Sequence, residues 1–480
     1  HVGLPHTPGL HLCLKNFSEF SKTSFMNTQE SEIIDKLLKE NASLRITIQI
    51  LNDRIAEISG QSSKNTSKPP SLDQKPNSTE LKSKGGAQIG HKAYQRKKFT
   101  KDEIDKTEYC TLTSCVHCGK TTLKPLKNLP PRQWIELKLG GRLIVEYVRA
   151  TYRCLSCGEI STAPLPDNIS LSPYGPRLQA LIGSLRGNYH LTMRKISYLI
   201  FEVLGVPLSC GSVSKIEKRL SDVLEDAYHE IRSSILSSDE CKYVDETRWR
   251  INGKTAYTWL LSTKSACYYR ILSSRSRSAK DLVLGNNFNK KIVTDRYSAY
   301  KNIKSPHQYC LCHIKRNCQG FAERNGLVGY IGKQLVRVLE GVFRIHHDYS
   351  DKIISLEQYK SRSYSKKRQF SDWLREGYLF ANKRFSRFCS QMLLDFKHLW
   401  TYLRYPDMEM TNNRAERAIR PIVIWRKMCA GSRSERGAEY ASIITSIVQT
   451  LKIQKIDILN FLERSFVNNW NDNHLPQFFS

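Results

Sequence analysis

A chain of 480 residues is too long for one ordinary hydrophobic core, so we expect two to four domains. Its 75 Lys and Arg residues outnumber the 45 Asp and Glu residues by 30, a net charge that is unusual for a metabolic enzyme. This charge fits a partner that is rich in phosphate; the alternative is a basic surface that only keeps the protein in solution. No apolar stretch reaches 18 residues, and the start lacks the charged and apolar regions of a signal peptide, so neither a membrane span nor secretion is expected.

The N-terminal part divides into three segments. Residues 1–30 form an arm to which we assign no structure. In residues 31–59, apolar side chains and Asn41 alternate spacings of three and four, which predicts a coiled coil that joins chains into a homo-oligomer, or else an amphipathic helix packed within its own chain. The Ser-, Lys- and Pro-rich residues 60–101 predict a basic flexible linker, which either lies along a DNA backbone or is simply solvated.

Two CxxC pairs mark residues 102–165 as a zinc-binding domain. The pairs are Cys115 with Cys118 and Cys154 with Cys157, and each ends in a Gly that permits a tight turn. Four thiolates at this spacing suit one structural, tetrahedral zinc ion, if the segment between the pairs folds as a hairpin that returns the chain. His117 and Cys110 are alternative ligands. Fourteen cysteines without a secretory signal fit reduced thiols.

Helical patterns follow in residues 172–234. The first two expected helices have apolar faces, and Gly205 is expected to end the second. A third helix begins near Ser212. A helix, a Gly-containing turn and a further helix are compatible with a helix-turn-helix that reads a DNA groove, and equally with an ordinary helical pair.

Residues 240–305 show strand signals and two acidic residues at expected strand ends. Strands are expected at CKYVDE, at AYTWLLST after the Asn252-Gly253 turn, at CYYRIL and at KKIVTD, with helices over 276–284 and from YSAYKN. Asp245 and Asp295 end the first and fourth strands. Residues 320–405 and 412–465 read as helical, with a break near Gly431, and Glu416 lies one turn into a helix capped by Asn412 or Asn413.

These three carboxylates are candidate metal ligands. Side chains at strand ends point into the crevice where open sheets bind ligands. Two hard cations, Mg²⁺ or Mn²⁺, need oxygen ligands from several carboxylates and can promote phosphoryl transfer. The alternative is that Asp245, Asp295 and Glu416 are three surface acids that cap strands and a helix.

Cations surround Glu416. This basic patch consists of Arg414, Arg417, Arg420, Arg426, Lys427, Arg433 and Arg436. It indicates contacts to double-stranded DNA, with salt bridges to the acid as the alternative. A second group of possible metal ligands lies about 100 residues before Glu416 and consists of Cys310, Cys312, His313 and Cys318. Their spacing is not a standard metal-binding one, so ordinary thiols are favoured over a second metal site.

The order of several motifs resembles the transposases of the insertion sequence 66 family. VDET, TDRY and NNRAERAIRP are followed by RKMCAGSRSERGAE. SKPPSLD, GGAQIGHKA, the CxxC pairs, SPYGPRLQALIGSL, GVPLSCGSVSKI and LCHIKR are also similar and in the family's order. Together they cover most of residues 26–465, and it is their collinearity that makes the resemblance specific.

The resemblance implies a multidomain α/β protein. Residues 238–465 would form an RNase H-like catalytic domain with a helical insertion at about 320–405, and the family's catalytic triad maps onto Asp245, Asp295 and Glu416. The implied activity is metal-dependent cleavage and strand transfer of the element's DNA, in the cytoplasm with the bacterial nucleoid, and helper proteins are possible partners. A DNA-binding protein or regulator that has lost catalysis is the alternative.

Overall fold

The computed structural model describes residues 98–470, apart from positions 139, 168, 170, 171, 381 and 406, and eight positions between 37 and 51. The expected arm at 1–30, most of the expected coiled coil and the linker up to residue 97 lie outside these described residues. The eight described positions are helical, and Leu37, Leu44, Ile48 and Leu51 have exposed side chains. Pairing of two chains through residues 31–59 therefore stays a prediction.

Two small sheets follow the short 3-10 helix η3 (Lys101–Glu103). One has the order β1-β4-β3, from β1 (Lys106–Cys110), β3 (Arg132–Lys138) and β4 (Gly141–Arg149), and the other has the order β2-β5-β6, from β2 (Leu123–Pro125), β5 (Thr151–Cys154) and β6 (Ile160–Thr162). The antiparallel β3–β4 pair is the returning hairpin that the sequence required. The strands themselves were not predicted individually.

Three helices come next: α3 (Pro176–Gly187), α4 (Met193–Leu204) and α5 (Cys210–Ser237). Thr192 and Ser209 cap α4 and α5 through their side chains, and Gly205 ends α4 with a φ of 60° in the left-handed region, as expected. Ile196 and Ile200 form the buried face of α4, whereas Val203 is exposed. Binding of a DNA groove by these helices stays a prediction.

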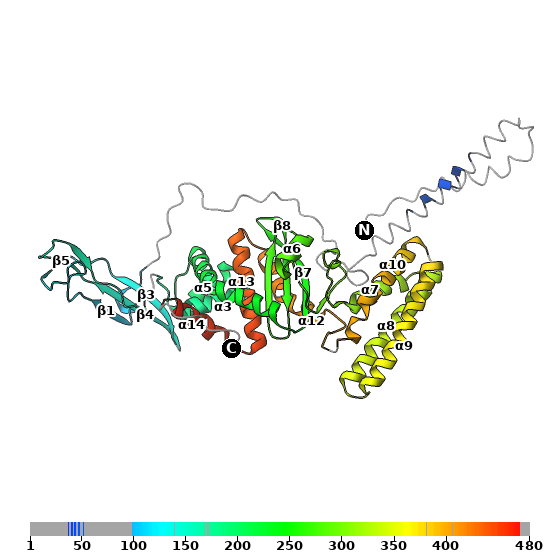
Figure 1. Ribbon diagram of the computed structural model, residues 1–480. Coiled ribbons are helices and arrows are strands. Elements are labelled where there is room, and N and C mark those ends of the chain that lie inside the picture. Colours follow the sequence, from blue (N-terminus) through cyan, green and yellow to red (C-terminus); the bar gives the residue numbers. More distant parts are fainter. Residues whose placement is uncertain are drawn as a thin grey trace, which may run out of the picture. The chain divides into compact units, whose positions relative to one another are not determined.

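A five-stranded mixed sheet lies at the centre of the remaining chain (Figure 1). Its order is β11-β10-β7-β8-β9, from β7 (Lys242–Ile251), β8 (Lys254–Ser262), β9 (Cys267–Leu272), β10 (Ile292–Thr294) and β11 (His307–Tyr309). The strands β7, β8 and β9 form an antiparallel meander, whereas β10 and β11 run parallel to β7. The first four strands were expected from the sequence. The short β11 was missed.

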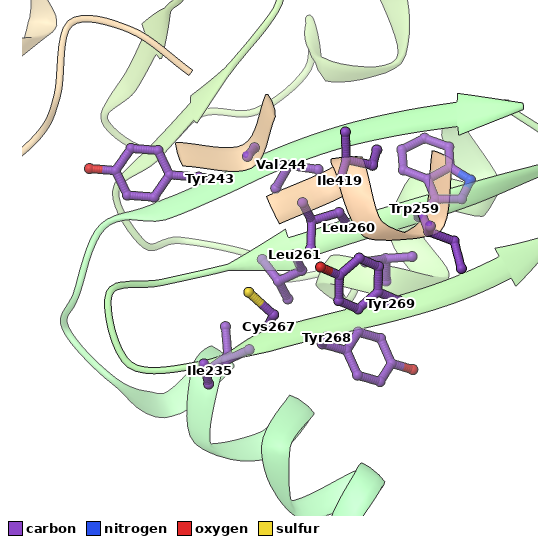
Figure 2. Packing of buried hydrophobic residues seen from close by; sticks show 14 of the residues in the cluster. Ile235, Tyr243, Val244, Trp259, Leu260, Leu261, Cys267, Tyr268, Tyr269 and Ile419 are labelled. Atoms are coloured by element: carbon purple, nitrogen blue, oxygen red, sulfur yellow. The ribbon is translucent and has the colours of Figure 1, made fainter. Parts of the chain in front are cut away.

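Large aromatic and aliphatic side chains fill the core around this sheet. Figure 2 shows side chains of β7, β8 and β9 with Ile419 of α12 (Asn413–Cys429) and Ile235 of α5. Trp259, Leu260 and Tyr269 are completely buried. Each fully buried apolar side chain contributes roughly 1.5–3 kcal/mol, so this packing holds the strands that carry the acidic residues.

The outer strand β9 is covered by hydroxyl groups of α13 (Glu435–Gln454). Thr450 Oγ1, Ser446 Oγ and Ser442 Oγ accept the backbone N–H groups of Cys267, Tyr269 and Ile271 at 3.1, 2.8 and 3.0 Å. These hydroxyls recur every four residues and lie on one face of the helix. The helix thereby satisfies donors that an edge strand leaves unpaired.

Helices make up the segment between β11 and Glu416, as predicted. They are α7 (Leu311–Ala322), α8 (Gly326–Ser350), α9 (Leu356–Phe380), α10 (Lys383–Leu394) and α11 (Phe396–Leu399), followed by the 3-10 turn η5 (Thr401–Leu403). The helix α6 (Arg277–Leu284) also matches its predicted range. The helix expected from YSAYKN is only the 3-10 turn η4 (Ser298–Tyr300).

The predicted break near Gly431 separates α12 from α13. Gly431 has a φ of 97°, and a Cβ at this position would lie 2.4 Å from the carbonyl oxygen of Arg250, so only glycine fits. The last helix, α14 (Ile458–Trp470), extends beyond the predicted end at residue 465. Among the described residues, none of the helices has the length and apolarity needed to cross a membrane.

Candidate active site and zinc cluster

Asp245 lies inside strand β7, not at its end. The strand continues to Ile251, so the predicted boundary is wrong. Trp249 and Ile251 are buried and alternate with exposed residues, which extends the strand pattern past the acidic residues. By the same alternation, Asp245 shares a face of the sheet with Tyr243 and Thr247.

Asp295 directly follows β10, as the sequence predicted. The parallel register pairs Ile292 with Lys242 and Val293 with Tyr243. At this register, Asp295 lies level with Asp245 on the neighbouring strand. The Oδ1 atom of Asp295 accepts the backbone N–H of Tyr297 at 2.9 Å, which orients the carboxylate at the start of the loop.

Asn412 fixes the helix that carries Glu416. Its side-chain Nδ2 donates to the carbonyl oxygen of Val244 at 2.8 Å, next to Asp245, and its carbonyl oxygen accepts the N–H of Glu416 at 3.0 Å. The expected side-chain cap is absent, because the Asn412 amide binds strand β7 instead. This anchor holds the start of α12 against β7, next to Asp245.

The negative charges of Asp295 and Glu416 both affect the protonation of Asp245. Burial raises the pKa of Asp245 well above its usual value, and the charges of Glu246, Asp295 and Glu416 raise it further. Within the described residues, the buried Glu416 Oε1 and Asn412 Oδ1 atoms have no hydrogen-bond partner. Carboxylate oxygens are the ligands that a hard divalent cation prefers, so the chemistry of these residues fits Mg²⁺ or Mn²⁺. In the described part of the chain, the three carboxylates are not among the groups whose ligand atoms all lie within 4.8 Å of one another.

The four predicted zinc ligands come together in one cluster. The Sγ atoms of Cys115 and Cys157 are 3.7 Å apart, and those of Cys118 and Cys154 are 3.6 Å apart. All four ligand atoms lie within 4.8 Å of one another, so the cluster could bind zinc. Neither Cys110 nor His117 belongs to this group in the described part of the chain.

The two CxxC turns have matching backbone geometry. In the first turn, the backbone N–H of Cys115 donates to the carbonyl oxygen of Lys120, and the N–H of Gly119 donates to the carbonyl oxygen of Cys115, each at 2.9 Å. In the second turn, Cys154 N bonds Glu159 O and Gly158 N bonds Cys154 O, at 2.8 and 2.9 Å. The N–H groups of Cys157 and Ser156 lower the pKa of Cys154 to about 6, against the effect of burial. The turns therefore stabilise the thiolate form that binds zinc.

Comparison with known proteins identifies the family. The family model described as "Transposase IS66 family" matches residues 172–440, which include Asp245, Asp295 and Glu416. This match covers more than half of the chain. The chain belongs to the IS66 transposase family. A relative from Sinorhizobium fredii (strain NBRC 101917 / NGR234), named "Uncharacterized protein y4hP", is 21% identical over 382 residues, which are 72% of this chain and 68% of that protein.

A fourth acidic residue, Glu246, was not singled out from the sequence of this IS66 transposase. Its side chain is fully buried, forms an ion pair with Arg275 and accepts a hydrogen bond from the Tyr300 hydroxyl. Burial and the charge of Asp295 raise the pKa of Glu246 to about 7, although Arg275 and Tyr300 act in the opposite direction. Glu246 alternates with Asp245 and so lies on the other face of β7.

The raised pKa of Glu246 predicts a pH-dependent stability. A carboxyl group whose pKa rises from 4.5 to about 7 on folding stabilises the fold below pH 4.5, and this contribution, on the order of 3 kcal/mol, is lost as the pH rises through 7. Without divalent ions, we expect the melting temperature to fall between pH 5 and 8. We expect a smaller fall in Glu246→Gln, measured by calorimetry.

The matched control is Asp372→Asn, which removes an exposed carboxylate from α9. It should keep the pH dependence of the parent. An identical fall of the melting temperature in Glu246→Gln and in the parent would contradict the assignment.

The basic patch divides into two groups. Arg414 pairs with Glu409 at 2.9 Å, Arg426 Nη1 binds Thr247 Oγ1 at 3.0 Å, and Arg436 binds Ser214 Oγ at 2.7 Å. Arg417, Arg420, Lys427 and Arg433 have exposed side chains, and Arg436 is exposed despite its hydrogen bond. The first three of these lie on one side of α12, opposite the buried residues Ala415, Ile419, Ile422 and Trp425.

A basic cavity of about 760 Å³ lies where α12 gives way to α13. Its lining includes Arg186, Arg194, Lys218, Arg433 and Arg436. Among the acidic residues only Glu217 lines it, and Glu217 is paired with Arg186 at 2.7 Å. Residues near the N-termini of α4 and α5 also line this cavity, so both helices begin next to Arg433 and Arg436 of the basic patch.

Proposed function

We propose that this chain is an active transposase that cuts and joins DNA at Asp245, Asp295 and Glu416. The observation that supports the proposal is the placement of these carboxylates: Asp245 lies in β7, Asp295 directly follows the parallel strand β10 at the same level, and Glu416 lies on a helix anchored to β7. Family membership supports a transposase role. The sheet order and the helical segment before α12 also fit an RNase H-like domain with a helical insertion.

Asp245, Asp295 and Glu416 would hold two Mg²⁺ or Mn²⁺ ions. When bound, such ions activate an attacking hydroxyl group and stabilise the leaving oxygen of a phosphodiester. Asp245 contributes a carboxylate that is held in place inside a strand, and Asn412 anchors the helix that carries Glu416 to the same strand. No covalent protein intermediate is needed, so hydrolysis at the element's end would leave a 3′-hydroxyl group that then attacks target DNA.

The direct test combines purified chain, the element's own end sequences, target DNA and Mg²⁺. We expect cleavage at the ends followed by joining of the freed 3′-hydroxyl groups, and no reaction with a chelator. A chain that binds the ends tightly but never cuts them would favour the alternative of an inactive DNA-binding protein.

The exposed side of α12 is the proposed DNA contact. Replacing Arg417 or Arg420 with Ala should weaken DNA binding and lower the slope of log K against log salt by about one for each phosphate that is no longer bound. The measurement is a fluorescence anisotropy titration at several salt concentrations.

The contrasting variant is Arg426→Ala. The Arg426 guanidinium binds Thr247 and the carbonyl oxygen of Arg248, so its loss should lower the melting temperature and leave the salt slope unchanged. A full salt slope in both Arg417→Ala and Arg420→Ala would remove these residues from the DNA contact.

The wider assignments stay proposals. The partner is double-stranded DNA at the element ends and the target, within a homo-oligomer joined through residues 31–59, with helper proteins as possible additions. The protein would act in the cytoplasm at the bacterial nucleoid.

A further inference from the structure

Three side chains of different chemistry meet beside the proposed active site. Cys310 Sγ, a ring nitrogen of His313 and a carboxylate oxygen of Glu416 all lie within 4.8 Å of one another. The His313 Nδ1 and Glu416 Oε1 atoms are 3.6 Å apart and form an ion pair when His313 is protonated. Both atoms are buried, and neither has a hydrogen-bond partner in the described part of the chain. Since unpartnered buried polar atoms cost free energy, these atoms point to a bound ligand.

The local fold places Cys310 and His313 together. Cys310 is the N-cap residue of α7, and His313 lies three residues later, in the first turn, so both side chains lie on one side of the helix. Backbone hydrogen bonds from Cys310 N to Thr294 O and from Leu311 N to Met410 O, at 2.9 and 3.0 Å, hold this end of α7 between β10 and the segment before α12.

The segment before α12 also holds Cys310. The backbone N–H of Asn412 donates to Cys310 Sγ at 3.1 Å. Asn412 therefore touches both sites, since it also anchors Glu416 to β7. The Cys312 thiol and burial raise the pKa of Cys310, so a bound cation must displace the proton of this thiol. The cluster can be reached from outside, because the side chains of His313 and Glu416 are 20% and 33% exposed.

We propose that Cys310, His313 and Glu416 form a binding site for a thiophilic divalent cation of the Zn²⁺ class. One thiolate, one imidazole and one carboxylate suit zinc or cobalt with a fourth, open position, whereas Mg²⁺ prefers oxygen ligands alone. The site differs from the set considered from the sequence. Cys318 belongs to the hydrophobic core, and Glu416 replaces it from a distant helix.

Because Glu416 belongs to both ligand sets, the two sites compete. A cation held by Cys310 and His313 draws the Glu416 carboxylate away from Asp245 and Asp295. Zinc is therefore an inhibitor of the Mg²⁺-dependent reaction, a consequence that rests on the proposed function. The binding of the ion does not rest on it.

Cobalt(II) tests the site directly, because a thiolate ligand gives a sulfur-to-cobalt charge-transfer absorbance. The full-length reduced chain is first dialysed against a chelator that leaves zinc on the four-cysteine cluster, and is then titrated with Co²⁺. We expect one equivalent to bind with this absorbance. Cys310→Ser should abolish it, and His313→Ala and Glu416→Gln should each weaken binding by more than about tenfold.

Two controls isolate the signal. Cys318→Ser removes a thiol from the same helix and should titrate like the parent. Cys154→Ser removes any cobalt bound at the zinc cluster, and the absorbance that depends on Cys310 should remain. Thermal melting confirms that the part of each variant that contains the central sheet is folded. The proposal is overturned if a reduced parent shows no such absorbance, if Cys310→Ser retains it, or if His313→Ala binds Co²⁺ as tightly as the parent.

The cobalt titration needs no DNA, so it decides the site even if the chain never cuts DNA and the proposed function fails. In a chain that does cut, Zn²⁺ should inhibit the parent at concentrations at least about tenfold lower than it inhibits Cys310→Ser. Equal inhibition of both would overturn the sharing of Glu416.

Discussion

Replacing Asp245 with Asn, Asp295 with Asn or Glu416 with Gln is expected to lower the rates of DNA cleavage and strand joining by about a thousandfold or more. Each change removes a negative charge from the oxygen ligands that the proposed ions require. Both reactions should fail together, because they would use the same ions. DNA binding should stay nearly unchanged, since it depends on cations that contact phosphate.

Glu409→Gln is the matched control. Glu409 is a nearby carboxylate whose partner is Arg414, and its N–H contacts the Tyr243 hydroxyl, but it is outside the triad. Its replacement should leave cleavage within a few-fold of the parent. The rates are best measured as single turnovers on labelled element ends. Parent-like cleavage by any one of the triad variants would remove that residue from the proposed site.

These expectations rest on residues that the sequence did reveal. Asp295 follows a short, fully buried strand, and Glu416 lies in the first turn of a helix with a clear cationic pattern, so both could be located from local sequence alone. The two CxxC pairs were equally readable, because each turn is built within five or six residues. Such features depend on short-range geometry, which a single sequence carries.

Long-range contacts could not be read in the same way. Asn412 has the sequence features of a helix cap, but its amide binds Val244, about 170 residues earlier, because the helix end packs against β7. The end of β7 was misplaced because Asp245 and Glu246 interrupt the apolar run, while only tertiary packing shows that Trp249 and Ile251 are buried. The meeting of Cys310, His313 and Glu416 likewise joins the ends of two helices.

The charged residues around Glu416 illustrate the same limit. Seven cations in one stretch read alike in the sequence, and all were assigned to DNA. Arg414, Arg426 and Arg436 also bind acceptors within the chain, whereas Arg417, Arg420 and Lys427 share the exposed side of α12, and the DNA contact of all seven stays a prediction. Helical periodicity separates the groups only once the buried face of α12 is known.

Loss of one zinc ligand should unfold the small unit at residues 102–165 and leave the central sheet folded. Zinc binding at four thiolates contributes roughly 10–16 kcal/mol in small zinc-finger peptides, more than two three-stranded sheets can supply by themselves. Cys154 is the most informative position, since it is buried, ends β5 and lies opposite Leu123 of β2. Cys154→Ser therefore removes a ligand without changing the strand pairing directly.

Cys110→Ser is the control for this experiment. Cys110 ends β1 in the same unit but lies outside the cluster. We expect the parent and Cys110→Ser to retain close to one chelator-resistant zinc per chain by mass spectrometry, and Cys154→Ser to lose it. Hydrogen exchange should then become fast across β2, β5 and β6, while the amides of β9, which are held by α13 hydroxyls, stay protected.

Zinc near zero in a reduced parent, or zinc retained by Cys154→Ser and lost by Cys110→Ser, would show that the four cysteines are not the ligands. Because zinc binds the thiolate form, we expect it to leave the cluster as the pH falls and protons compete for the four sulfur atoms.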